Sequence, residues 1–300
     1  MSDVIGGYRC MTPMQTAGSG SARWCIASRG LNRYFLKEFL SPVYPVQPHT
    51  PLGQRQLERC MHFEKRKQRL YAAASCVIGD VLVPVIDFFR SGGHYYAVSE
   101  AAPEGYFTAE HADRLPEDGK RKLLCDLALC LQRLHAQGVV HADLKPEHVL
   151  LIRQPHGWQA QLIDLDSGFL MDDPPKAEQE IEGDPAYLAP ETFLRLMGEE
   201  APLTAALDTF AFGAMIQQIW TGRMPEFDRE RYQYLYEAAL DGGEIVLNLP
   251  EAWELTVRRM LHADPLQRPS DAEIISLFAP EKKAGTGAPA RNGLSRLMKV

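Results

Sequence analysis

Two short stretches of the chain bring carboxylates and a lysine close enough in sequence to act on one substrate. Asp143 and Lys145 follow an expected helix and precede an apolar strand. Asp164 and Asp166 come directly after what reads as a second strand. Because two strands joined by a short link form a hairpin, we expect Asp143 and Asp164 at one edge of it. Such a group suits a reaction on a metal-bound phosphate. One carboxylate would receive a proton, one would hold the cation, and the lysine would stabilise negative charge.

The first stretch resembles the catalytic loop of eukaryotic-type, or Hanks-type, serine/threonine protein kinases. It reads His-Ala-Asp-Leu-Lys-Pro-Glu-His from 141 to 148, and Asp164-Leu165-Asp166 falls where that family has Asp-Phe-Gly. A lysine two residues after the aspartate is typical of serine/threonine rather than tyrosine kinases. The resemblance covers residues 8–279 and marks the chain as a divergent member. Further matching pieces, in order, are Gly183–Glu191, Asp208 and Arg268.

The resemblance implies an α+β, bilobal protein-kinase-like fold. A small, mostly β N-lobe would carry one long helix, and a larger C-lobe would be mostly helical. We expect the N-lobe over residues 1–99, a hinge over 100–105 and the C-lobe over 106–280. A flexible basic tail would follow over 281–300, a stretch rich in glycine, alanine, lysine and arginine.

Three residues of the C-lobe are implied to stabilise its architecture. Asp208 would hold the backbone of the catalytic loop, and Glu191 would form a buried ion pair with Arg268. Between 108 and 137 the chain reads as a helix whose leucines recur at helical spacing, so we expect them in the core. These leucines are Leu123, Leu124, Leu127, Leu131 and Leu134.

The resemblance also assigns residues of the N-lobe to ATP. Gly18 and Gly20 lie in a Gly-x-Gly turn between two expected strands, where N–H groups can approach phosphates because glycine has no Cβ. Lys37 on the next strand is implied to bind the α- and β-phosphates. Glu64 on the following helix would pair with Lys37, with Glu58 as the alternative. Taken without the resemblance, Lys37 reads as a surface lysine and the glutamates as the solvated face of a helix.

Adenine would bind at the hinge through backbone groups of Glu100 and Ala102, with Ser99 as the small residue that guards the deep pocket. Phe35 stands where the family usually has a small alanine packed on adenine. Its ring either narrows the nucleotide pocket or turns aside.

At the catalytic end, the resemblance assigns ATP with Mg²⁺, or Mn²⁺, as the phosphoryl donor. Asp143 would orient the acceptor hydroxyl and take its proton, Lys145 would stabilise the γ-phosphate, and Asp164 would chelate the cation. His148 stands where the family has asparagine, the second metal ligand, and an imidazole nitrogen is a poor ligand for Mg²⁺. Asp166 stands where the family has glycine. It either supplies a replacement carboxylate or is a solvated loop acid or cap.

The segment after Asp164 departs from the family pattern. Ala142 replaces the arginine that reads a phosphorylated activation loop, and residues 168–186 contain no serine, threonine or tyrosine. Control by phosphorylation of this loop is therefore not expected. Asp184 replaces a threonine, and we expect it to pair with Lys145 and repel Asp143. The acids of the loop either mimic a charged loop, favour basic substrates or only keep the loop soluble. They are Asp172, Asp173, Glu178, Glu180 and Glu182.

Composition excludes several classes of protein. With 45% hydrophobic and 24% charged residues, the 300-residue chain can bury a sizeable core. Its net charge of −7 gives no basic footprint, so we expect no nucleic-acid partner. No run of 18 apolar residues and no apolar leader occur, so neither membrane binding nor secretion is expected. The six cysteines show no metal-ligand spacing and are typical of reduced thiols in a cytoplasmic protein.

Two functions from different classes remain open. The intact lysine and aspartates favour a serine/threonine protein kinase that transfers the γ-phosphoryl group of ATP to protein hydroxyls without control by loop phosphorylation. Its partners would be ATP and a protein substrate, basic if the loop acids contact it. His148, Asp184 and Phe35 favour a pseudokinase that acts as a nucleotide-binding or scaffolding regulatory module. A kinase fold that uses ATP for another transfer is a third alternative.

Overall fold

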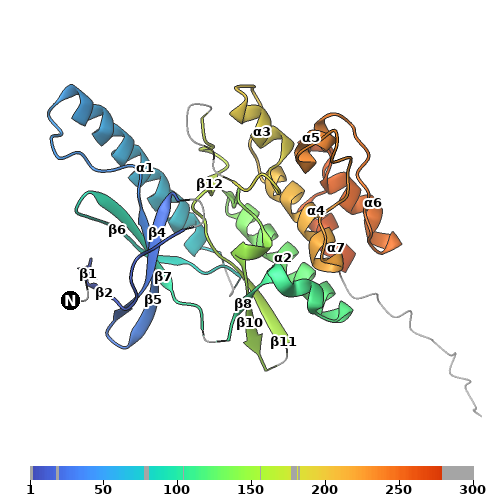
Figure 1. Cartoon of the computed structure of the whole chain (residues 1–300), viewed down its shortest axis with the longest axis horizontal. Coiled ribbons are helices and arrows are strands. Elements are labelled where there is room, and N and C mark those ends of the chain that lie inside the picture. Colours follow the sequence, from blue (N-terminus) through green and yellow to red (C-terminus); the bar gives the residue numbers. More distant parts are fainter. Residues whose placement is uncertain are drawn as a thin grey trace, which may run out of the picture.

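The computed structural model of the chain has a sheet lobe and a helical lobe. They meet at a central segment that contains the short strands β9 (Val139–Val140) and β12 (Phe169–Leu170). Figure 1 shows α1 beside the sheet and the remaining long helices on the opposite side of that segment. The α+β, bilobal fold is therefore confirmed. Gly18 and the predicted tail over 281–300 lie outside the described residues. The structure describes residues 3–17, 20–77, 81–103, 105–155, 157–176, 181 and 183–278.

An antiparallel sheet of seven strands forms the smaller lobe, in the order β1-β2-β4-β5-β7-β6 with β3 paired to β4. Side chains alternate along β5, so Leu36 is fully buried on one face while Phe35 and Lys37 lie on the other. The strands are β1 (Val4–Ile5), β2 (Tyr8–Cys10), β3 (Gln15–Thr16), β4 (Ala22–Arg29), β5 (Asn32–Phe39), β6 (Val85–Ser91) and β7 (His94–Glu100).

The long helix α1 (Pro51–Ser75) packs on the sheet lobe and reaches the central segment. It begins where the Thr50 side chain accepts a hydrogen bond from the Gly53 N–H, with a proline at the first helical position. A stripe of residues at helical spacing is buried along its inner face. That stripe is Cys60, Lys67, Leu70, Tyr71 and Ala74.

The helical lobe follows the hinge and is built around two helices, α2 (Glu117–Ala136) and α4 (Ala206–Thr221). The single helix expected over 108–137 is divided, because Pro116 is extended at φ −62° and ψ 156° and disfavours helix in the residue before it. The other elements are β8 (Phe107–Thr108), η1 (Ala109–Arg114), β9 (Val139–Val140), η2 (Pro146–His148), β10 (Val149–Gln154), β11 (Gly157–Leu162), β12 (Phe169–Leu170), α3 (Pro190–Leu196), α5 (Leu235–Leu240), α6 (Glu251–Met260), η3 (Pro265–Gln267) and α7 (Asp271–Phe278).

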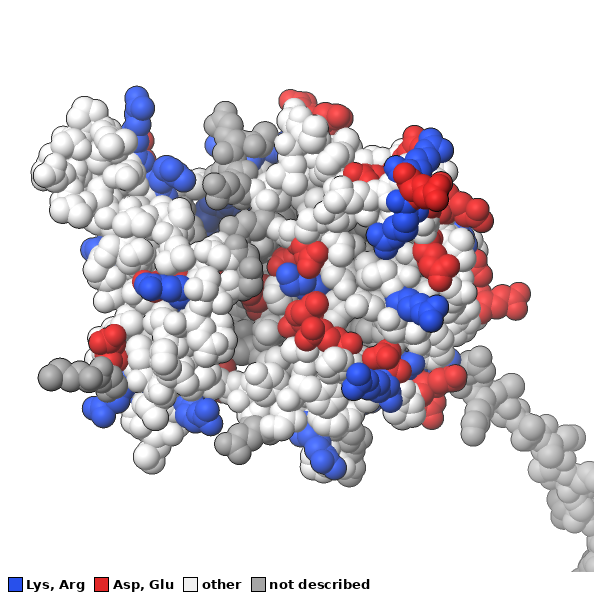
Figure 2. Space-filling model, viewed as in Figure 1, with Lys and Arg blue, Asp and Glu red and all other residues white. Residues whose placement is uncertain are grey.

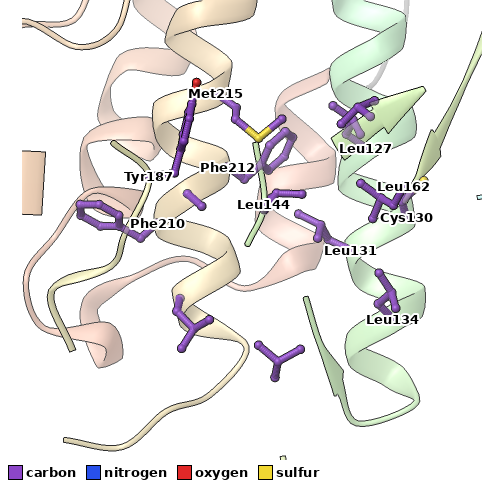
Figure 3. Close-up of a cluster of buried hydrophobic side chains, with 14 of the residues drawn as sticks. Leu127, Cys130, Leu131, Leu134, Leu144, Leu162, Tyr187, Phe210, Phe212 and Met215 are labelled. Carbon is purple, nitrogen blue, oxygen red and sulfur yellow. The ribbon is translucent and has the colours of Figure 1, made fainter. Parts of the chain in front are cut away.

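The core of this lobe fills the space between α2 and α4. The predicted leucine stripe of α2 is confirmed, with every member between 0% and 4% exposed. Figure 3 shows Leu127 and Leu131 of this stripe facing Phe212 and Met215 of α4, with Leu144 of the catalytic loop between the two helices. Leu144 is 2% exposed, so the residue that separates Asp143 from Lys145 is itself part of the core. In the described part of the chain, every helix is too short or too polar to span a bilayer.

A buried ion pair joins the start of α3 to the segment before α7. Arg268 contacts both carboxylate oxygens of Glu191 at 2.7 and 2.8 Å, and the two side chains are 1% and 2% exposed. The remaining guanidinium hydrogens bond to the carbonyl oxygens of His262, Ala206 and Ala263, so all five donors are used. The predicted pairing of Glu191 with Arg268 is confirmed.

Replacing Arg268 with leucine should destabilise the fold by about 3–5 kcal/mol, because Glu191 would remain buried without a counter-charge. Urea unfolding followed by circular dichroism measures this loss. Arg259→Leu is the matched control, because Arg259 pairs with Glu273 on the surface and should leave the midpoint almost unchanged. Equal midpoints for both variants would show that the buried pair does not stabilise the fold.

Candidate active site

The catalytic loop is fixed by Asp208 in the first turn of α4. Its carboxylate accepts hydrogen bonds from the backbone N–H groups of His141 at 2.8 Å and Ala142 at 2.9 Å. Asp208 is 1% exposed, so these contacts form in a low-dielectric interior where hydrogen bonds to a carboxylate are strong. Ala142 has φ 65°, a left-handed conformation that is costly outside glycine and needs such support. The prediction that Asp208 holds the loop backbone is confirmed.

A histidine that the sequence did not reveal completes this support. His135 at the end of α2 lies 3.0 Å from Asp208 through Nε2 and 3.0 Å from Asp271 through Nδ1. Burial disfavours the charged imidazole, but hydrogen bonds with the two carboxylates outweigh it and raise the pKa of His135 to about 9. No local motif marks this histidine, because its partners come from two later helices.

Asp143 and Lys145 face the same space as predicted, and Asp184 lies beside them. The Lys145 Nζ is 3.2 Å from an Asp143 carboxylate oxygen and 3.9 Å from one of Asp184. The backbone N–H of Asp184 donates to Asp143 at 3.1 Å. Asp184 therefore contributes a donor to Asp143 through its main chain, in addition to the negative side chain that the sequence predicted next to Lys145.

The sheet lobe contacts the helical lobe through Lys37. Its Nζ lies 2.9 and 3.0 Å from the two carboxylate oxygens of Asp164. Burial would raise the pKa of Asp164, but the charge of Lys37 dominates and holds that pKa well below its usual range. Asp164 has φ 64°, so its backbone is strained at the position where the carboxylate meets the lysine. These two side chains lie near Asp143 and Lys145, because His148 contacts both Asp143 and Asp164.

The expected pairing of Glu64 with Lys37 is not formed. The Glu64 carboxylate accepts hydrogen bonds from Tyr95 and Gln68, both at 3.3 Å, while Lys37 pairs with Asp164 and with Asp166. The physical reason is the register of α1. Glu64 lies next to the buried stripe, whereas Lys67, three residues later, is inside it and only 7% exposed. The helical spacing of that stripe was the signal available in the sequence.

The three predicted metal ligands lie near one another but contact other groups. His148 has Nδ1 2.7 Å from the carbonyl oxygen of Asp143, so this nitrogen carries the proton and donates. Its Nε2 is 3.7 Å from Asp164. Asp166 is 21% exposed and lies 2.5 Å from the Lys37 Nζ, so it is neither a solvated loop acid nor a simple cap. Among the described residues, no three histidine, cysteine or acidic side chains are grouped to hold a metal ion.

Two aromatic rings cover the sheet face that carries Lys37. In the β4–β5 ladder Trp24 lies directly opposite Lys37, and Ile26 opposite Phe35. The rings of Trp24 and Phe35 stack with centroids 5.2 Å apart at 27°, and both are half-buried. Phe35 thus turns towards Trp24 on the sheet face that carries Lys37.

The predicted hinge and the glycine turn are placed at the two ends of this sheet. Glu100 ends β7 opposite Tyr34, and the Ala101 N–H still bonds to the sheet, so Ala102 is the first residue beyond it. At the other end Gly20 has φ 73°, and nothing lies within 4 Å of the place where a Cβ would be. A glycine is required there by backbone conformation rather than by crowding.

The arrangement is that of a protein-kinase fold in which Lys37, Asp143 and Asp164 lie near one another. A family model of the protein kinase domain matches residues 65–277. The chain therefore belongs to the protein kinase family.

Three curated relatives show how this chain compares with longer proteins. It is 29% identical to the serine/threonine-protein kinase pkn2 of Myxococcus xanthus over 246 residues. The aligned region covers 75% of this chain and 28% of pkn2. It is 32% identical to the serine/threonine-protein kinase PkaA of Streptomyces coelicolor over 149 residues, which are 49% of this chain and 26% of PkaA. It is 26% identical to the phosphorylase b kinase gamma catalytic chain, liver/testis isoform, of Bos taurus over 275 residues, which are 87% of this chain and 64% of that relative. The chain spans about a quarter of the length of the two bacterial relatives.

The charge of His135 should make stability depend on pH. Its folded pKa of about 9 exceeds the ordinary 6.5, so its contribution is complete below pH 6.5 and is lost as the pH rises through 9. Urea unfolding at pH 6.5, 8 and 9.5 should show a loss of up to roughly 3 kcal/mol that is missing in His135→Gln. The exposed control His49→Gln should follow the wild-type curve. Parallel curves for wild type and His135→Gln would contradict this assignment.

Proposed function

We propose that the chain is a serine/threonine protein kinase that transfers the γ-phosphoryl group of ATP to protein hydroxyls. The observation that carries the proposal is the contact of Lys37 with Asp164 at 2.9 Å, close to Asp143 and Lys145. Phosphoryl transfer needs little covalent chemistry from the protein, so positioned charges of this kind supply most of the rate. The serine/threonine kinase names of the relatives support the same reading.

Each charged group has a defined part in this proposal. Lys37 binds the α- and β-phosphates, and Lys145 stabilises the γ-phosphate. Asp143 orients the acceptor hydroxyl and accepts its proton. The ionised, partly exposed carboxylate of Asp164 fits a hard divalent cation such as Mg²⁺ or Mn²⁺, which would neutralise phosphate charge when bound. His148 and Asp166 stay predictions as metal ligands.

For the nucleoside, we place adenine between the hinge and the aromatic pair of the sheet. The carbonyl of Glu100 and the N–H of Ala102 would bind its edge, and Gly20 would cover the phosphates. Phe35 lies on β5 between Lys37 and the hinge end of the sheet, and its ring stacks with that of Trp24, so the pair can stack on the base. Such stacking contributes about 1–3 kcal/mol per base.

Activity without phosphorylation of the activation loop is supported by contacts between that loop and α1. Arg69 binds Asp172 at 2.8 Å and Asp173 at 3.2 Å, and Arg66 donates to the Asp173 carbonyl at 3.2 Å. Phosphorylation commonly orders such a loop by adding negative charge opposite arginines. Here Asp172 and Asp173 supply that charge permanently. The other acids of the loop, Glu178, Glu180 and Glu182, lie outside the described residues.

We further propose a cytoplasmic enzyme whose partners are ATP and a basic protein substrate, without nucleic acid or membrane. Among the described residues all six cysteines are free, which fits a reducing compartment. Near the catalytic loop, burial raises the pKa of Glu147, and Glu110 and Asp184 raise it further, so three acids face one area. A basic segment of substrate would lower this repulsion. Figure 2 shows acidic and basic groups interspersed over the helical lobe, with no continuous basic area on that face.

A nucleotide-binding or scaffolding regulatory module without catalysis is the second candidate. The observation that favours it is that Asp164 and Asp166 both contact Lys37, while His148 is bound to the Asp143 backbone. A module of this kind would show a thermal shift with ATP and a divalent cation but would not transfer phosphate.

Transfer of radioactive γ-phosphate to a generic basic protein, with Mg²⁺ and then with Mn²⁺, tests catalysis. Asp143→Asn should lower the rate about 100-fold or more, because the proton acceptor is removed. Asp118→Asn, on the exposed first turn of α2, is the control and should keep the wild-type rate. Equal rates for wild type and Asp143→Asn would contradict the kinase reading. A thermal shift with ATP but no transfer would favour the regulatory module.

Disrupting the contact between α1 and the loop should lower activity without unfolding the protein. Arg69→Gln removes both aspartate contacts of a half-exposed arginine, so we expect a loss in kcat of about 3- to 10-fold. Arg55→Gln, exposed at the start of the same helix, is the matched control. Phosphatase treatment should leave wild-type kcat unchanged, and a fall after treatment would contradict control by fixed charge.

A further inference from the structure

The inner face of α1 carries a buried lysine, Lys67, where the helix meets residues 164–166, here called the catalytic segment. Lys67 lies in the buried stripe of the helix, with Nζ 2.5 Å from the backbone carbonyl oxygen of Asp166. The rings of Phe39, Phe63 and Tyr71 surround the ammonium group, with centroids 5.4 to 5.8 Å away. An aromatic cage and a carbonyl stabilise a cation that has lost its water.

An acid stands on the opposite side of the same contact. Asp166 places a carboxylate oxygen 2.5 Å from the Lys37 Nζ, and its N–H donates to Asp164 at 3.2 Å. Lys37 is thus held by two carboxylates of one loop, both from the helical lobe. In the family that the chain resembles, a helix glutamate holds this lysine, and glycine occupies the position of Asp166.

Charge balance links Lys67 on α1 to Asp166 in the loop. The buried group contains two lysines, Lys37 and Lys67, and two carboxyl groups, those of Asp164 and Asp166. Burial lowers the pKa of Lys67 and raises that of Asp166, and the opposite charges nearby act against both shifts. With glycine at 166, two lysines would share the single carboxylate of Asp164. With a glutamate at 67 and Asp166 retained, three carboxylates would face one lysine. Either state leaves an uncompensated buried charge, which is costly.

We propose that Asp166 and Lys67 are positioning residues that exchange the usual places of acid and base. Asp166 orients Lys37 for the nucleotide phosphates, and Lys67 holds α1 against the main chain of the catalytic segment. Glu64 has no part in this contact. The inference rests on the proposed phosphoryl transfer, which supplies the reaction that Lys37 is positioned for.

A double substitution tests the exchange by removing the acid at position 166 and placing an acid at position 67. Asp166→Gly and Lys67→Glu, each alone, should lower kcat/KM for ATP by about 10- to 100-fold, mainly through KM, because each leaves the buried group unbalanced. The double variant Lys67→Glu with Asp166→Gly should recover to within about 5-fold of wild type. Lys65→Met, exposed on the same helix, is the surface control.

Nucleotide binding and unfolding provide readouts that do not need catalysis. Trp24 lies opposite Lys37, so its fluorescence should report ATP binding, and Trp24→Phe identifies its signal. The same recovery should appear in nucleotide affinity and in the urea midpoint, where the double variant should exceed both single variants.

Additive losses in the double variant would overturn the proposal. It would also be overturned if Glu64→Gln lowered nucleotide affinity as much as Asp166→Gly does. A wild-type protein without phosphate transfer would refute the proposed function alone, because affinity and unfolding would still report whether positions 67 and 166 are coupled.

Discussion

The contact of Lys37 with Asp164 is the interaction on which the rest of this structure depends. It joins the sheet lobe to the helical lobe across 127 positions of sequence, and both side chains are mostly withdrawn from water. Charges in such a place are stable only when they are paired and held in fixed geometry. The surrounding elements are therefore constrained to keep charge balanced around this pair. That constraint explains why Lys67 can be buried on α1, where a lysine without nearby carboxylates would be costly.

The two lobes satisfy the constraint in different ways. In the helical lobe, Asp208 and Arg268 use almost their full hydrogen-bonding capacity on backbone groups and on His135 and Glu191. Behind them, the packed leucines of α2 make the catalytic loop part of the core. In the sheet lobe, by contrast, α1 meets the catalytic segment through the buried Lys67 and the half-exposed Arg69. The catalytic loop is thus fixed by hydrogen bonds to its backbone and by packing of Leu144 in the core. The position of α1, in contrast, is set by ion pairs and hydrogen bonds.

Sequence reasoning succeeded where a residue's partner is fixed by a local motif. The catalytic loop, Asp208, Glu191 and Arg268 fall in contiguous patterns, and their contacts followed from the family's architecture. It failed at Glu64, because the resemblance placed the pairing acid there, whereas the register of α1 turns Lys67 towards the core. It also left Asp166 between two alternatives, since its partner Lys37 lies on a distant strand and no local pattern identifies it. Contacts of this kind are set by tertiary packing, so they become visible only when the chain is folded.

The exchange of acid and base also changes what α1 can do. A helix glutamate that pairs with a lysine can leave that partner when the helix moves, since both groups end flexible side chains. The partner of Lys67 is the main-chain oxygen of Asp166, two residues after Asp164. Aromatic rings from α1 and the sheet surround the ammonium group of Lys67. Moving α1 outwards would separate a desolvated cation from that oxygen and from the nearby carboxylates. The arginine contacts to Asp172 and Asp173 resist the same movement. The helix is therefore held in one position by charges that are permanent, in agreement with a loop that contains no residue to phosphorylate.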